Sequence, residues 1–208
     1  MQRETYLCTK EDLPDLIQLI NDTTAMYGAD LHRIGAAKVN IERLQTIFGE
    51  KKPTNTESEF FIIGHKENGV LIGFCINAFW ASLPVWHCGP YFTKLDIFDK
   101  VASEILLLSI IKKGIEIAES RSVFSFYYIT RFSTQWKRSN NMIMEQFPDY
   151  SVSEVEVLEP FAKSKYIAFS MLLGVMDGRN EKPIAILNCT KSVTYGNLDY
   201  KRNNGLHI

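Results

Sequence analysis

Residues 60–80 read FFIIGHKENGVLIGFCINAFW. Two runs rich in β-branched and aromatic residues, Phe60–Gly64 and Val70–Trp80, flank the polar segment His65–Gly69. Such runs favour β-strands, and the pair Asn68-Gly69 favours the positive φ angles of a tight turn between antiparallel strands. The stretch therefore predicts a β-hairpin.

On the amino-terminal side of the hairpin the sequence predicts one short strand and two helices. The strand, Glu4–Cys8, is followed by Thr9 and Asp12 in the pattern of a capping box, and then by apolar residues at helical spacing. Apolar positions between residues 34 and 48 indicate a second helix. The polar segment 49–58, which contains a proline, predicts a loop before the hairpin.

Beyond the hairpin the patterns predict alternating strands and helices. In order, these are a strand at 84–91, a long helix at 101–118, a strand at 123–130, a helix at 133–147, and strands at 150–158 and 166–174. The long helix carries an apolar stripe that is wide enough to be buried on more than one side. The order indicates an antiparallel front half joined through a crossover helix to a parallel pair of strands.

The chain has enough apolar material for one domain and a tail. Of its 208 residues, 46% are hydrophobic and 12% aromatic, which suffices for a single buried core. We expect one mixed α/β domain over residues 1–174 and a carboxyl-terminal extension over 175–208. The extension contains one apolar island, Ile184–Leu187, which either adds a strand or packs on a partner.

Charge and cysteine usage exclude several classes of function. The net charge is −1, so no overall positive field exists to recruit nucleic acid or an anionic membrane. No apolar run approaches the roughly 18 residues of a membrane span, and the amino terminus is too polar for a signal peptide. The four cysteines show no metal-ligand spacing. We expect a soluble, metal-free protein of the cytoplasm, or of a particle assembled inside the cell.

The order of the predicted elements resembles that of GNAT N-acyltransferases over residues 3–174. Two fragments add to the resemblance: Lys10–Leu16 is similar to the start of that family's domain, and Asn68–Phe74 is similar to its central hairpin. The resemblance implies a central mixed sheet of about six to seven strands flanked by about four helices. It also implies acetyl-CoA or another acyl-CoA as cofactor and an amine as acceptor.

The resemblance implies a pyrophosphate loop where the fourth strand meets the long helix. The family's loop carries an arginine or glutamine and two small residues, which let backbone N–H groups approach the phosphates. Here Thr93, Asp96 and Phe98 occupy those three places. Asp96 brings negative charge and Phe98 brings bulk, although a carboxylate at a helix start also stabilises the helix. Thr93, Lys94 and Lys100 are the candidate cofactor contacts.

Candidate catalytic residues are His87, Tyr127 and Tyr128. His87 lies on the strand where the family's cleft opens, and an ordinary histidine pKa suits a general base, although a packed histidine explains the position as well. The family's general acid is a tyrosine on the helix predicted at 133–147, and this helix contains none. Tyr127 and Tyr128 on the preceding strand are alternative proton donors, or they simply pack.

Two carboxylates are candidates for binding the acceptor amine. Glu154 and Glu156 are two residues apart on a predicted strand and so share one of its faces. An exposed strand face explains the pair equally well.

The sequence leaves two functions open. The first is an N-acyltransferase that moves an acyl group from acyl-CoA to a small-molecule or protein amine. The second is a catalytically inactive scaffold of the same fold that serves as an assembly subunit of a larger complex, such as a virion. The scaffold would associate with itself or with other proteins through residues 175–208. The altered loop and the missing tyrosine favour the second function, and no other catalytic motif competes.

Overall fold

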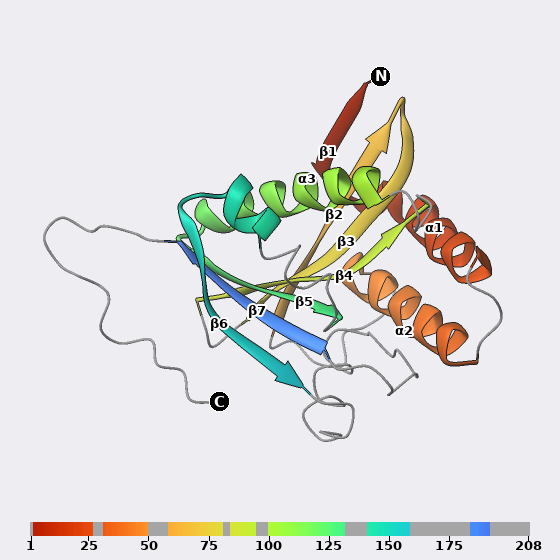
Figure 1. Ribbon diagram of the computed structural model, residues 1–208. Coiled ribbons are helices and arrows are strands. Elements are labelled where there is room, and N and C mark those ends of the chain that lie inside the picture. Colours follow the sequence, from red (N-terminus) through yellow and green to blue (C-terminus); the bar gives the residue numbers. More distant parts are fainter. Residues whose placement is uncertain are drawn as a thin grey trace, which may run out of the picture.

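A computed structural model describes residues 2–26, 31–49, 58–80, 84–94, 100–131, 141–158 and 184–191. These residues form a seven-stranded mixed sheet with helices on both of its faces (Figure 1). In chain order the elements are β1 (Arg3–Leu7), the 3-10 turn η1 (Lys10–Asp12), α1 (Leu13–Met26), α2 (Leu31–Ile47), β2 (Ser58–Glu67), β3 (Val70–Trp80), β4 (Trp86–Thr93), α3 (Lys100–Glu119), β5 (Ser125–Arg131), β6 (Tyr150–Leu158) and β7 (Ile184–Lys191). A further short helix covers residues 141–146. The mixed α/β class predicted from the sequence is confirmed.

The hairpin at the centre of the prediction is present. β2 and β3 pair antiparallel along their whole length. Asn68 and Gly69 form the turn with φ angles of 48° and 81°, which are the positive values that this pair favours. β2 begins at Ser58, two residues before the predicted start, and extends as far as the turn.

The strands lie in the order β1-β2-β3-β4-β5-β7-β6. β1 to β4 pair antiparallel, whereas β4 and β5 pair parallel and are joined through α3. The predicted antiparallel front half and crossover helix are therefore confirmed. The helix predicted at 133–147 is described only from residue 141, so its start lies outside the described residues.

The sheet extends into the segment predicted as a tail. The apolar island at residues 184–187 adds a strand, because β7 lies between β5 and β6 and pairs antiparallel with both. The division at residue 174 is thus not a division of the sheet. The apolar signal of β7 is only four residues long, and the strand's neighbours are distant in sequence. The strand predicted at 166–174 lies outside the described residues.

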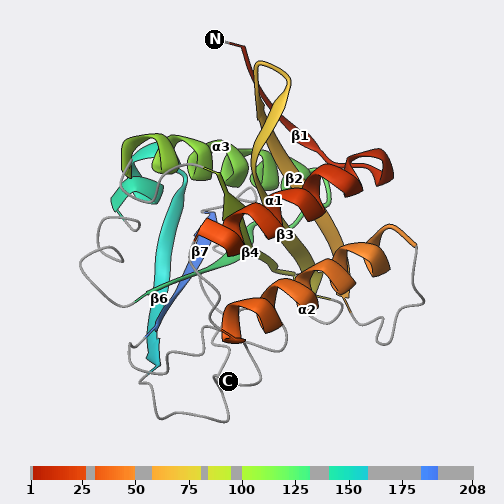
Figure 2. The same cartoon turned by 90° about the vertical axis from the view of Figure 1, so that its right-hand side faces the viewer.

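Alternate residues of the central strands fill two cores. Toward α3 the sheet presents Trp86, Cys75 and Phe126, and toward α1 and α2 it presents Ile62, Phe74 and other residues. Figure 2 looks onto the face that α1 and α2 cover. This alternation is the period of two expected of strands covered on both sides.

Close packing of α3 depends on Gly114. The fully buried indole of Trp86 lies directly against this position, and a Cβ atom added there would overlap the ring. A residue without a side chain therefore allows α3 to approach the sheet.

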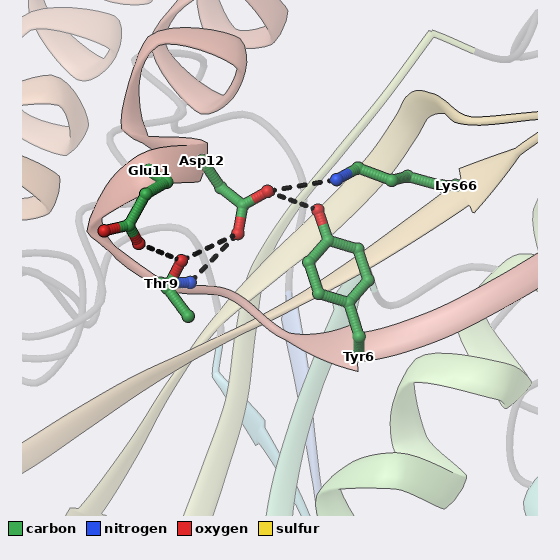
Figure 3. Close-up of polar contacts among 5 residues, drawn as sticks. All are labelled: Tyr6, Thr9, Glu11, Asp12 and Lys66. Atoms are coloured by element: carbon green, nitrogen blue, oxygen red, sulfur yellow. Dashed lines mark hydrogen bonds and ion pairs between the residues drawn. The ribbon is translucent and has the colours of Figure 1, made fainter.

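The amino-terminal cap that the sequence predicts is present (Figure 3). The carboxylate of Asp12 accepts a hydrogen bond from the backbone N–H of Thr9 at 3.0 Å and another from the hydroxyl of Tyr6 at 2.8 Å. Nζ of Lys66 lies 3.1 Å from the same carboxylate. Burial alone would raise the pKa of Asp12, but these hydrogen bonds outweigh it and the pKa is lowered. The cluster fixes β1 and η1 to β2.

Candidate functional site

β4 contains a bulge at Gly89 and Pro90. Between the regular pairs on either side, β3 contributes one residue, Ile76, while β4 contributes these two. Gly89 has a φ of 142°, which side chains rarely allow. A Cβ atom at this position would also lie only 3.1 Å from Cε1 of His87. Both observations explain why glycine occupies the bulge, and such bulges bend a strand away from its neighbour.

The parallel pairing of β4 with β5 stops just before this bulge. Three residue pairs join the two strands, and the last is Cys88 with Tyr128. β4 continues to Thr93 and β5 to Arg131, but the described part of the chain holds no further pair between them. The arrowheads of the two strands lie apart in Figure 1. We call the unpaired stretch between residues 89–93 of β4 and 129–131 of β5 the β4–β5 opening.

A row of four side-chain positions crosses the sheet beside the opening. Phe60 of β2 pairs with Ala78 of β3, Ala78 with His87 of β4, and His87 with Tyr127 of β5. Paired residues present their side chains on the same face of a sheet. Arg43 of α2 lies over the Phe60 end of the row, with its guanidinium carbon 5.6 Å from the centroid of the Phe60 ring. The opening is therefore bordered on this face by an imidazole, a phenol and a nearby cation.

His87 is buried and uncharged. Its side chain is 2% exposed. Burial, assisted by the positive charge of Arg43, lowers the pKa of His87 to about 3, against a weaker opposing effect of a hydrogen bond with the backbone of Gly89. A general base needs a pKa closer to the working pH, so this environment argues against the predicted role of base.

One ring nitrogen of His87 lacks a hydrogen-bond partner. Nε2 is inaccessible to solvent, and nothing in the described ranges bonds to it. The adjacent Cys88 belongs to the core on the α3 side, so the two residues face opposite ways, as neighbours on a strand do.

The two candidate tyrosines follow one another on β5. Tyr127 is 9% exposed and lies in register with His87. Tyr128 is the partner of Cys88 in the last pair before the opening, and its side chain lies outside the described part of the structure. The role of proton donor stays a prediction for both.

The candidate cofactor residues lie where β4 ends and α3 begins. The hydroxyl of Thr93 donates a hydrogen bond to the carbonyl of Ile72 at 3.2 Å, and Nζ of Lys94 lies 3.2 Å from a carboxylate oxygen of Asp22 on α1. Lys100 is the first residue of α3, and its side chain is outside the described part, as are Asp96 and Phe98. Their contact with a cofactor stays a prediction.

The two glutamates lie farther along the sheet. Glu154 and Glu156 of β6 pair with Asn188 and Ile186 of β7. Because β7 and β5 lie between β6 and β4, the sheet order does not bring this pair to the edge of the opening. Their side chains are not described, and a role in amine binding stays a prediction.

Sequence reasoning missed three features of the site. The Gly89-Pro90 pair inside a strand was a usable signal, since proline in a strand favours a bulge or an edge. Arg43 gave no signal, because a cation on a helix usually faces solvent. Nor did the spacing of the cysteines indicate that Cys75 and Cys88 lie 3.8 Å apart, sulfur to sulfur, in the core.

The described ranges lack metal-site and membrane-span features. No group of histidine, cysteine and carboxylate side chains there could hold a metal ion. None of the helices there is both long and apolar enough to cross a membrane.

Comparisons with known proteins identify the fold. No protein-family model matches the sequence, and no curated protein matches it. Among solved structures, a probable acetyltransferase from Staphylococcus epidermidis matches with a TM-score of 0.58 and 15% identity, covering 92% of this chain and 100% of that one. The ribosomal-protein-S18-alanine N-acetyltransferase from Escherichia coli matches with a TM-score of 0.55 and 12% identity, covering 95% and 99%.

A third match is the PaiA N-acetyltransferase from Thermoplasma acidophilum in complex with coenzyme A. Its TM-score is 0.54 at 13% identity, and the match covers 92% of this chain and 100% of that one. These identities are too low to carry over an activity, but the likeness extends over nearly the whole of each chain. The protein has the GNAT fold that the order of its elements predicted.

Proposed function

We propose that the protein is an N-acyltransferase that binds an acyl-CoA thioester in the β4–β5 opening and transfers its acyl group to an amine. The observation that carries this proposal is the end of the β4–β5 pairing at Cys88, next to the bulge at Gly89. Beyond that point the edge of β4 is not paired with β5. The pantetheine arm of CoA is extended and carries two amides, so it can bond to a strand edge as an added strand does.

The phosphate end of the cofactor would lie at the carboxyl end of β4. The five residue-to-residue steps from Gly89 to Lys94 span about 16 Å, which is similar to an extended pantetheine arm. Lys94 is bound to Asp22 in an ion pair whose side chains are 38% and 36% exposed. Such exposed pairs are worth about 0 to 1 kcal/mol, so Lys94 can turn to a phosphate at little cost.

The reaction is a direct attack on the thioester. The amine nitrogen attacks the carbonyl carbon, a C–N bond forms, and the C–S bond then breaks. The CoA thiolate leaves and takes up one proton, while the amine loses one. Tyr127 and Tyr128 are our candidates for delivering the proton to the thiolate. They belong to the last two residue pairs between β4 and β5, next to the opening.

Two solved neighbours support the proposal by their own activities. The protein from Escherichia coli is an N-acetyltransferase, and the one from Thermoplasma acidophilum is an N-acetyltransferase bound to coenzyme A. Both share this chain's fold over nearly their whole lengths.

Calorimetry with CoA, acetyl-CoA and longer acyl-CoAs tests the binding step. We expect measurable heat and a thermal shift, and a several-fold weaker Kd in the double variant Lys94→Ala, Lys100→Ala. The matched control is Lys112→Ala, Lys113→Ala, which makes the same change in net charge about 18 Å farther along α3. The control should bind as the wild type does, and equal losses in both double variants would remove the phosphate site from the account.

An assay of CoA release with a panel of amines tests the transfer step. Acyl transfer to any amine supports the enzyme. Binding without transfer would contradict the proposed activity while leaving the binding site intact. A chain that binds no CoA and instead associates through residues 175–208 would support the scaffold.

A further inference from the structure

Nε2 of His87 is a buried nitrogen without a hydrogen-bond partner in the described residues. Buried polar atoms are almost always hydrogen-bonded, and leaving one unpaired is unfavourable because it has lost its bonds to water. The structure also offers a contrast. His65 is 3% exposed, and its Nδ1 lies 2.7 Å from the hydroxyl of Thr5. In the described residues Nε2 of His87 has no such partner. An atom of a bound molecule would supply one.

The position of His87 lets the reacting end of a bound ligand be the hydrogen-bond partner of Nε2. The ring lies against the bulge, because a Cβ atom at Gly89 would be 3.1 Å from its Cε1 and 3.5 Å from its Nε2. His87 also precedes the last β4–β5 pair by one residue. A cofactor arm that runs back along β4 from Lys94 reaches the same point with its thioester end.

The neighbours of the ring decide what Nε2 can do. The hydrogen bond with the backbone of Gly89 favours the protonated ring, so a ring N–H donates to that backbone. Since Nε2 has no partner in the described part of the chain, the donor is Nδ1. In a neutral imidazole the other nitrogen then carries a lone pair. Nε2 is therefore a hydrogen-bond acceptor that needs an N–H group.

The charge around the ring selects the protonation state of that N–H group. Among the described residues, Arg43 of α2 acts on the ring through its charge, and Tyr127 of β5 is its titratable neighbour in the row. A cation beside a desolvated site repels an incoming ammonium. No strong base stands in the row to remove the extra proton of an ammonium, because His87 itself is a very weak base.

We infer that Nε2 of His87 accepts a hydrogen bond from the acceptor amine, and that the site takes weakly basic primary amines that arrive uncharged. Peptide α-amino groups and aromatic amines have this chemistry, whereas lysine side chains do not. His87 is then a positioning residue that holds the nitrogen toward the thioester carbonyl. The inference rests on the proposed function and names the acceptor class for it.

A substrate series tests the inference without altering the protein. The series contains a peptide with a free α-amino group and no lysine, an amino-terminally blocked peptide with one lysine, and an aromatic amine. With ordinary pKa values of about 8 and 10.4, the uncharged fractions of the two peptides differ about 250-fold at pH 7. We expect kcat/KM to favour the α-amino or the aromatic amine over lysine by on the order of 100-fold.

The faster of the two favoured amines shows whether the acceptor is a peptide α-amino group or an aromatic amine. A lysine peptide that reacts as well as the others at pH 7 would overturn the inference. The proposed function would survive that result, because acyl transfer would still occur. An absence of CoA binding would instead remove the proposed function.

Variants of His87 test the positioning role. His87→Leu should lower kcat/KM for the amine roughly tenfold, as expected for one lost hydrogen bond, and leave the Kd for acetyl-CoA unchanged. His87→Gln keeps an acceptor oxygen and should recover part of the loss. His65→Leu and His65→Gln are the matched controls at the other buried histidine, and should leave the amine preference as it is. Equal losses with leucine and glutamine at position 87, or a Kd for acetyl-CoA that rises as the rate falls, would contradict the role.

Discussion

Acid is expected to weaken the fold through His87. The histidine pKa is about 6.5 in an unfolded chain and about 3 in the folded protein. Between these values the unfolded state binds more protons than the folded state, so stability falls as the pH falls below about 6.5. Each pH unit in this window costs about 1.4 kcal/mol, which gives about 2 kcal/mol between pH 7 and pH 5.

The variant His87→Gln isolates this effect, because it removes the titrating ring and keeps every other ionisable group. It should be less stable than the wild type at pH 7 through lost packing, and the difference should shrink by about 2 kcal/mol at pH 5. Urea unfolding at constant ionic strength, followed by tryptophan fluorescence, to which the buried Trp86 contributes, measures both proteins. Ile76→Val, a buried change without a titrating group, should keep the pH dependence of the wild type.

An equal pH dependence of stability in the wild type and in His87→Gln would contradict this prediction. If the free energies of unfolding of the wild type and His87→Gln run parallel from pH 7 to pH 5, then His87 titrates normally in the folded protein. The account of a buried, uncharged imidazole at the bulge would then be wrong.

Three further predictions concern the parts of the fold that hold the site. Gly114→Ala should destabilise the protein by about 1 to 3 kcal/mol, because the new methyl group overlaps Trp86. Urea unfolding measures this loss, and a variant as stable as the wild type would contradict the prediction. Asp12→Asn should cost about 1 kcal/mol at pH 7, and the difference should disappear as the pH falls below about 4, where the lowered pKa of Asp12 stops favouring the folded state. The four cysteines are buried, so an aromatic disulfide reagent should label them only in denaturant; rapid labelling of the native protein would show that the cores open.

The predictable part of the fold is the part with local signals. Asn68-Gly69 has a local signal, because these two residue types favour the positive φ angles that the turn has. The crossover helix α3 is also visible as a long apolar stripe. β7 is different, since its position depends on pairing with β5 and β6. A short apolar island cannot show which distant strands it joins.

The candidate site, like the fold, could be predicted only where the sequence carries a local signal. The sequence singled out His87, which the structure places beside the opening. Its charge state could not be predicted, because the low pKa arises from burial and from Arg43, 44 positions earlier in the chain. A tertiary contact of this kind has no trace in a local motif.

An NMR titration with CoA tests the central claim, that the β4–β5 opening binds the cofactor. Backbone amide signals report binding residue by residue, whether or not transfer follows. We expect the largest shifts at residues 88–94 of β4 and its end and at 127–131 of β5, with little change at the β2–β3 turn. Shifts confined to other elements, or none at millimolar CoA, would contradict the account.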